Sequence, residues 1–252
     1  MTRNGQQPCD APPERRRILY GRRRGRPLRP GRRDLIDILL PRLSIVLPDQ
    51  GRLDPATLFP DASAETWLEI GFGGGEHLAA QARNHPDVGF IGCEPFVNGV
   101  AGLLSRVEKD GLANVRIFDD DARKLFPFLP DAGIGKVYTL FSDPWPKKRH
   151  CRRRFIAAGT LDAMARFLKD GAEFRFASDH RGYVRWTLEH LIRHPDFSWP
   201  AKSKRDWTNL PPDWVETRYE KKAKNQGAQP VYLCFRRRSR VREGGGKITE
   251  NH

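Results

Sequence analysis

The chain of 252 residues has no long apolar run and few cysteines. Its best apolar stretch, residues 35–47, is interrupted by two charged residues and a proline, so it falls short of the roughly 18–20 residues that a membrane helix needs. The four cysteines are dispersed without a C-x-x-C pair, which indicates neither a disulfide framework nor a zinc site. The N-terminus lacks the apolar region of a secretory signal. We therefore expect a cytoplasmic protein without a membrane span or a metal.

Positive charge is distributed unevenly along this chain of net charge +14. Residues 1–33 hold 11 arginines against two acids, a net of +9, and residues 236–252 hold six bases against two acids, a net of +4. The span between them carries only +1, but it contains one basic cluster, made of Lys147, Lys148, Arg149, Arg152, Arg153 and Arg154. A mildly acidic body with basic arms and a basic patch is typical of a nucleic-acid binder. Tails that only aid solubility or touch anionic lipid are the alternative.

Composition divides the chain into three parts. Residues 1–33 form a basic arm whose arginine runs are broken by glycine and proline, so we expect it to be flexible. Residues 34–236 form one folded domain, and residues 237–252 a flexible basic tail.

The folded part alternates strands with helices. The expected strands are 66–70, 88–93, 115–118, 137–141, 172–177 and 231–235, and the expected helices are 76–83, 96–110, 155–168 and 182–193. This alternation predicts an α/β fold with a doubly wound, mostly parallel sheet and helices on both faces. Ligands of such sheets bind beyond the carboxyl ends of the strands. Five acidic residues lie at or just past those ends: Glu69, Glu94, Asp121, Asp143 and Asp179.

A glycine-rich turn follows the first strand, with glycines at positions 71, 73 and 75. The nicotinamide fingerprint G-x-G-x-x-G would require glycine where Glu76 stands, and a carboxylate at a helix start repels a pyrophosphate. S-adenosylmethionine, a zwitterion with a sulfonium, meets no such obstacle. Glu94 is placed to bind ribose hydroxyls, and Asp121 with Ala122 to receive the adenine amino group. A tight strand-to-helix turn without a ligand is the alternative.

Four motifs together resemble the bacterial tRNA (guanine-N7-)-methyltransferases. They are Glu69-Ile-Gly-Phe-Gly-Gly-Gly-Glu76, Gly92-Cys-Glu-Pro95, Ser142-Asp-Pro-Trp-Pro-Lys-Lys-Arg-His150 and Thr217-Arg-Tyr-Glu220. The similarity runs from about Tyr20 to Phe235, and the Asp-Pro-Trp-Pro-Lys-Lys-Arg-His string is its most specific part. The lysine-rich residues 221–227 depart from the glycine-rich continuation of many members.

This resemblance implies a Rossmann-like methyltransferase fold that uses S-adenosylmethionine to methylate a variable-loop guanine of tRNA, position 46 in tRNA numbering. By motif position, the family's cofactor-binding acids fall on Glu69, Glu94, Asp121 and Asp143, beside the glycine loop of Gly71, Gly73 and Gly75. Its substrate contacts fall on Lys147, Asp179, Thr217, Arg218, Tyr219 and Glu220.

Guanine N7 is a ring lone pair, so its methylation needs alignment and a held base rather than a strong general base. Asp143 is the candidate catalytic residue, because its carboxylate is suited to accept hydrogen bonds from guanine N1–H and the exocyclic amine. An ordinary Asp-Pro turn is the alternative for this residue. The basic residues Lys148, Arg149, Arg152, Arg153 and Arg154 are expected to contact RNA phosphates. For residues 217–220 the alternatives are the cofactor's methionine end, the guanine, or a plain basic surface loop.

Two other classes of protein stay open from the sequence. A non-catalytic RNA-binding protein on a degenerate Rossmann scaffold is opposed by the presence of the glycine loop and the strand-end acids. A small-molecule methyltransferase is opposed by the basic arms.

Overall fold

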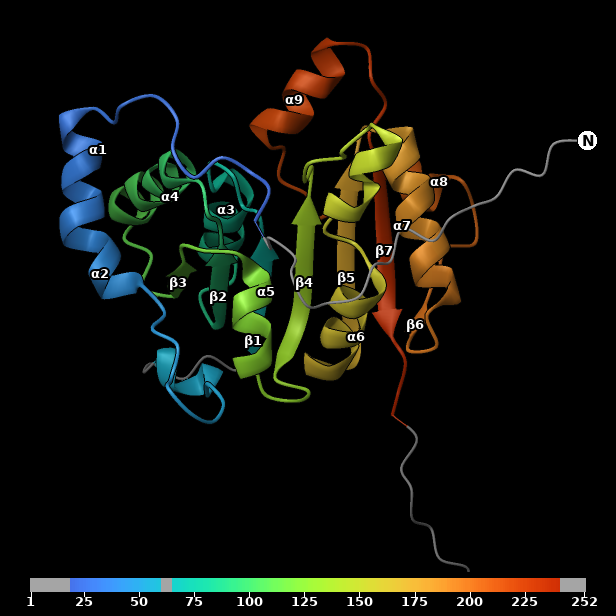
Figure 1. The fold of residues 1–252 in the computed structure, drawn as a ribbon, viewed down its shortest axis with the longest axis horizontal. Helices are drawn as coiled ribbons and strands as arrows, with labels where there is room; N and C mark the ends of the chain where they lie inside the picture. Colours follow the sequence, from blue (N-terminus) through green and yellow to red (C-terminus); the bar gives the residue numbers. More distant parts are fainter. Residues whose placement is uncertain (1–18, 60–64, 241–252) are drawn as a thin grey trace, which may run out of the picture.

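The computed structural model describes residues 19–59 and 65–240, which form one seven-stranded sheet with helices on both faces (Figure 1). The strands are β1 (Glu65–Ile70), β2 (Val88–Cys93), β3 (Val115–Phe118), β4 (Ile134–Leu140), β5 (Leu168–Ser178), β6 (Phe197–Ser198) and β7 (Val231–Arg237). Their order is β3-β2-β1-β4-β5-β7-β6. The first five in this order are parallel, whereas β7 runs antiparallel to both β5 and β6. The predicted doubly wound, mostly parallel sheet is confirmed.

Two apolar clusters join the helices to the sheet. On one face, α3 (Glu76–Asn84) and α4 (Val97–Asp110) pack through side chains such as Leu78 and Leu103. On the other face lie α5 (Ala122–Leu125), α6 (Ala158–Phe167) and α7 (Arg181–Arg193). The remaining helices are α1 (Pro30–Asp34), α2 (Leu40–Leu43), α8 (Arg205–Thr208) and α9 (Arg218–Asn225), with a π-helical turn over Leu35–Leu39 and 3-10 turns over Pro55–Leu58, Phe126–Phe128 and Lys148–Arg153. Within the described ranges no helix has the length and apolar character required to cross a membrane.

Residues 19–33, the described part of the predicted N-terminal arm, lie against the folded domain. Arg23 contacts Asp120 at 3.1 Å, and its carbonyl accepts a hydrogen bond from the amide of Val97. Asn98 accepts from the amide of Gly25 and donates to the carbonyl of Arg26, each at 2.8 Å. The segment therefore follows the start of α4 before α1 begins. The rest of the predicted arm, residues 1–18, lies outside the described residues.

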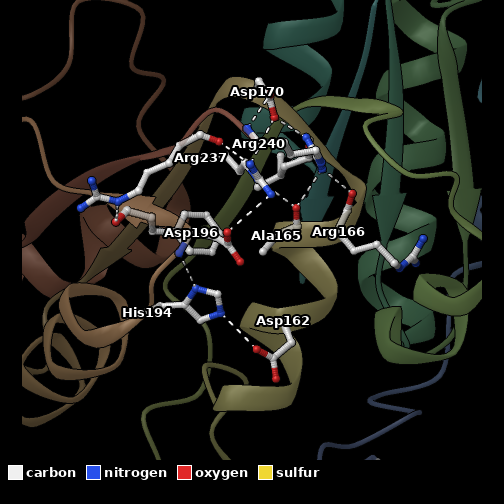
Figure 2. A network of polar contacts seen from close by, with 11 residues as sticks. Asp162, Ala165, Arg166, Asp170, His194, Asp196, Arg237 and Arg240 are labelled. Carbon is white, nitrogen blue, oxygen red and sulfur yellow. Dashed lines mark hydrogen bonds and ion pairs between the residues drawn. The ribbon is translucent and has the colours of Figure 1, made fainter. Parts of the chain in front are cut away.

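At the other end of the chain, the first residues of the predicted tail belong to a polar network (Figure 2). Arg237, at the end of β7, is 7% exposed and donates to the carbonyl of Ala165 and to Asp170. Arg240 donates to the carbonyls of Ala165 and Arg166, at the C-terminal end of α6, and to that of Leu168, the first residue of β5. These guanidinium groups satisfy carbonyls that a helix end leaves unpaired. Residues 241–252 of the predicted tail lie outside the described residues.

We expect Arg237→Ala to lower the free energy of unfolding by about 1.5–3 kcal/mol, the contribution typical of hydrogen bonds to charged groups. Urea denaturation measures this change. Arg236→Ala is the matched control, because the exposed Arg236 makes only a surface ion pair with Glu173, of the kind that contributes about 0–1 kcal/mol. Equal losses in the two variants would contradict a stabilising role for the network of Figure 2.

Candidate active site

A cavity of about 480 Å³ opens at the carboxyl ends of the central strands. β1 and β4 are neighbours there, while the chain continues from β1 to β2 on one side and from β4 to β5 on the other. Such a switch point leaves a crevice in which doubly wound proteins bind their ligands. The cavity is lined by the turn after β1, the ends of β2 and β4, the start of α5, and parts of the N-terminal segment and α9.

The glycine loop after β1 forms the floor of this cavity. Gly71, Gly73 and Gly75 all have positive φ, between 56° and 75°, which favours glycine at each position. Gly71 and Gly73 line the cavity, whereas Gly75 packs against Leu103 of α4 and begins α3. If residue 99 of α4 carried a side chain in place of glycine, its Cβ would lie 2.3 Å from the backbone oxygen of Gly73. Helix α4 and the glycine loop are therefore in close contact. The structure brings two of the three predicted glycines to the cavity.

Glu94 follows β2 and is attached to the same loop. Its Oε2 accepts from the amide of Gly73 at 2.8 Å, and its Oε1 accepts from the amide of Phe96 at 3.0 Å. Burial raises the pKa of Glu94 to about 7, the two amide hydrogen bonds oppose this, and the charges of Asp143 and Glu69 add to it. An ionised carboxylate keeps lone pairs that can accept further hydrogen bonds from a diol.

This raised pKa makes binding of a diol-bearing ligand depend on pH. A diol that bound only to the carboxylate form would release a proton on binding below pH 7, so its affinity should rise about tenfold per pH unit until a plateau above pH 7. Calorimetry with S-adenosylmethionine at pH 6 and pH 8 measures the change. The free energy of unfolding of the ligand-free protein should change in the opposite direction. Folding raises the pKa of Glu94, so this group contributes stability at low pH that is lost as pH rises through about 7.

Glu94→Gln is the control for this pH dependence, because the amide keeps its shape and does not titrate. An equally steep pH dependence in that variant would assign the proton to another group.

Asp121 lies after β3 and is buried at the wall of the cavity. It caps α5 by accepting from the amide of Arg123 at 3.0 Å, and the Arg123 guanidinium contacts both of its oxygens, at 2.8 and 2.6 Å. The carboxylate is thus held rigidly by α5 while the adjoining Ala122 also lines the cavity.

Asp143 reaches the cavity from the loop after β4. Phe141 and Trp145, on either side of it, have φ of 51° and 43°, a left-handed conformation that is rare for bulky residues. Such strain is found where a surrounding structure holds residues for function. Asp143 is exposed, and within the described part of the chain no side chain or amide hydrogen-bonds to its carboxylate. It is therefore available to accept donors from a ligand.

An aromatic and cationic wall completes the cavity. The Arg153 guanidinium lies 5.2 Å from the ring centre of Tyr20 and 5.0 Å from that of Trp145, and all three residues line the cavity. The sequence indicated Arg153 as a phosphate contact. Neither the cavity role of Tyr20 nor that of Phe96 was predicted, because no charge pattern or spacing identifies them.

Three of the predicted RNA-contacting residues and the predicted substrate contact Lys147 lie on an exposed rim beside this wall. They are Lys147, Lys148, Arg149 and Arg152, in and next to the 3-10 turn. Arg154 does not reach this rim. It is buried, donates to the carbonyl of Pro144 at 2.9 Å and lies over the Trp186 ring, so its predicted role at RNA is corrected to an internal contact.

Other predicted site residues lie away from the cavity. Glu69 is buried under α3, where its Oε2 is 2.7 Å from Nδ1 of His77. Asp179 is exposed after β5. Thr217 caps α9, and Glu220 is fully buried, whereas Tyr219 lines the cavity. Within residues 19–59 and 65–240, no group of three or more His, Cys, Asp or Glu residues is arranged to hold a metal ion.

Comparison with known proteins gives consistent matches. A family model described as "Putative methyltransferase" matches residues 63–233. The tRNA (guanine-N(7)-)-methyltransferase of Rhodospirillum rubrum is 52% identical over 230 residues, which cover 90% of each chain. Its counterpart in Paramagnetospirillum magneticum is 50% identical over 224 residues, covering 88% of this chain and 93% of that one. A solved structure described as an "Antibiotic Related Methyltransferase" is 16% identical with a TM-score of 0.50, covers 77% of this chain and 97% of its own, and shares the fold.

Proposed function

Because this chain belongs to the family of bacterial tRNA (guanine-N(7)-)-methyltransferases, we propose that it transfers a methyl group from S-adenosylmethionine to N7 of a guanine in tRNA, at position 46 of the variable loop. The observation that carries this proposal is that Glu94 and Asp143 line one cavity at the strand switch point and are close enough for their charges to interact. Because the proposed substrate is tRNA, we also propose that the protein is located in the cytoplasm.

The residues of the cavity suit S-adenosylmethionine. Glu94 has free lone pairs for the ribose hydroxyls, and Asp121 and Ala122 stand where the adenine is expected. Gly71 leaves its part of the floor without a side chain, and the Tyr219 ring lies against Gly73. The carboxylates of Glu94 and Asp143 also favour a positively charged ligand. When bound, S-adenosylmethionine supplies an electrophilic methyl group on a sulfonium.

The chain's own contribution is to hold the base and exclude competing orientations. Asp143 would accept hydrogen bonds from guanine N1–H and the exocyclic amine, which fixes the ring and offsets the positive charge that develops on it. The N7 lone pair attacks directly, and N7 carries no proton to remove, so no general base is required. Alignment within a preorganised site provides the rate enhancement.

The rim of Lys147, Lys148, Arg149 and Arg152 is proposed to bind tRNA phosphates. Lys148→Ala with Arg149→Ala should lower tRNA affinity and reduce the slope of log affinity against log salt by roughly 1.4–1.8, since each phosphate contact contributes about 0.7–0.9. Filter binding across a salt series measures this slope.

The matched control is the double variant Arg185→Ala with Arg193→Ala, which removes the same charge from exposed positions on α7. Equal slopes for the two double variants would place the tRNA elsewhere.

Incubation with methyl-labelled S-adenosylmethionine and unmodified tRNA, followed by nucleoside analysis, tests the proposed function. We expect label in 7-methylguanosine and none when the variable-loop guanine is replaced by adenine. Label in another nucleoside, or in small molecules only, would overturn the proposal. Binding of tRNA without any transfer would favour the non-catalytic RNA-binding class.

A further inference from the structure

Helix α9 covers the glycine loop. In Figure 1 it lies beyond the carboxyl end of β4, the end at which the cavity opens. The Tyr219 ring lies so close to Gly73 that a Cβ there would be 2.7 Å from Cε2. Arg218, the preceding residue, donates from Nε to Glu76 at 2.6 Å, at the start of α3. One wall of the cavity is thus the N-terminal turn of α9.

Isolated α9 would have little stability. It has eight residues, and helices shorter than about 12–15 residues are marginal in water. Four of those eight residues are lysine or arginine, which leaves little apolar surface for packing. Its position must therefore come from a few tertiary contacts.

The strongest of these contacts converge on Glu220, which is 0% exposed. Its Oε2 accepts from Nε1 of Trp214 at 2.6 Å, and its Oε1 accepts from the hydroxyl of Tyr232 on β7 at 2.5 Å. Lys224 pairs with the same carboxylate at 2.7 Å. A buried carboxylate with three charge-assisted contacts is held in one place, because breaking any of them leaves it partly unsatisfied. This carboxylate faces the protein interior and does not line the cavity.

Trp214 connects this carboxylate to the rest of the domain. Its ring centre lies 5.7 Å from that of His77 on α3 and 4.8 Å from that of Tyr232. The neighbouring Asp213 accepts from Gln81 of α3 through its carbonyl, and its carboxylate binds Arg175 of β5 at 2.6 and 2.8 Å. The segment before α9 is thereby attached to α3 and to the sheet.

We infer that Trp214 and Glu220 are positioning residues for the cofactor cavity: they hold α9 so that Tyr219 closes over Gly73. The inference rests on the proposed function for the identity of the ligand, S-adenosylmethionine. It replaces the expected substrate contact at Glu220 with an indirect role, exerted through its neighbour Tyr219.

Trp214→Phe tests this role, because it keeps an aromatic ring and removes the N–H that reaches Glu220. We expect the dissociation constant for S-adenosylmethionine, measured by calorimetry, to rise roughly tenfold, the scale of one hydrogen bond to a charged group. The affinity for tRNA should stay within about twofold, since phosphate contacts supply most of it.

Trp67→Phe is the matched control. Trp67 also donates from a buried indole to a carboxylate, Glu65, at 2.8 Å, but it lies on β1 away from the glycine loop. Both variants should lower the melting temperature to a similar degree, and Trp67→Phe should bind the cofactor like the wild type. Equal cofactor affinity in the two variants would reduce Trp214 to a stabilising residue and overturn the inference.

A double-mutant cycle shows whether Trp214 acts through Tyr219. Tyr219→Ala changes a side chain that is 46% exposed, so this variant should fold. If Trp214 only places Tyr219, adding Trp214→Phe to Tyr219→Ala should weaken cofactor binding by less than twofold more. Fully multiplicative losses would overturn the inference. If Trp214→Phe does not fold, Tyr232→Phe replaces it, because the Tyr232 hydroxyl donates to the same carboxylate.

The two proposals fail in different ways. A wild-type protein that binds S-adenosylmethionine but methylates no tRNA would overturn the proposed function and leave the role of α9 to be decided by the cycle. A wild-type protein that does not bind S-adenosylmethionine would overturn both.

Discussion

We expect Asp143→Asn to lower kcat for tRNA methylation by at least about 100-fold, the scale found when one preorganised polar group is removed from an active site. The amide keeps the shape of the side chain but loses the charge, and it presents an N–H where guanine also donates. Single-turnover transfer from labelled S-adenosylmethionine measures this loss. Affinity for tRNA should fall far less, because most of it comes from phosphate contacts.

The matched control is Asp119→Asn. Asp119 is also an exposed acid just past a strand, β3, but it does not line the cavity. We expect this variant to keep the wild-type rate. If Asp143→Asn also methylates at a near wild-type rate, Asp143 is an ordinary turn residue and the base is held by another group.

We expect Glu94→Ala to weaken binding of S-adenosylmethionine by at least about 1.5–3 kcal/mol, the contribution of a single charge-assisted hydrogen bond. The loss should exceed that one bond, because Glu94 also fixes the glycine loop through the amide of Gly73. Calorimetric titration gives the dissociation constant, and tRNA binding should change little.

Glu94→Gln serves as the partial replacement, since it keeps one acceptor oxygen without the charge. Its affinity should lie between those of the wild type and Glu94→Ala. An unchanged dissociation constant in Glu94→Ala would remove this residue from the cofactor pocket.

Most of the sheet could be predicted from the sequence, because each of its longer strands is a short apolar run with a turn or helix signal after it. β6 was not predicted, since two residues carry no periodicity. α9 was not predicted either, because it is rich in charge and its position depends on the buried Glu220. The helix expected from Phe155 begins at Ala158, where Thr160 bonds to the backbone of Ala157.

The part of the candidate site that could be predicted from the sequence consists of acidic residues at the ends of parallel strands. Acids at the ends of neighbouring parallel strands must meet at one edge, which brings Glu94, Asp121 and Asp143 to the cavity. That rule does not predict the direction of a side chain. Glu69, at the end of β1, was expected at the site but lies beneath α3 against His77. Contributions from distant segments, such as Tyr20, depend on tertiary packing that spacing does not encode.

The place of β7 in the sheet has a consequence for biosynthesis. β7 inserts between β5 and β6, so β6 cannot join the sheet until synthesis has passed residue 237. Until then the nascent chain presents β5, eleven residues long, as an edge strand with unpaired amides and carbonyls. The same final strand brings Tyr232 to Glu220. In a chain stopped before β7 on the ribosome, we therefore expect β5 to be open to pairing with another chain and Glu220 to lack its contact with Tyr232.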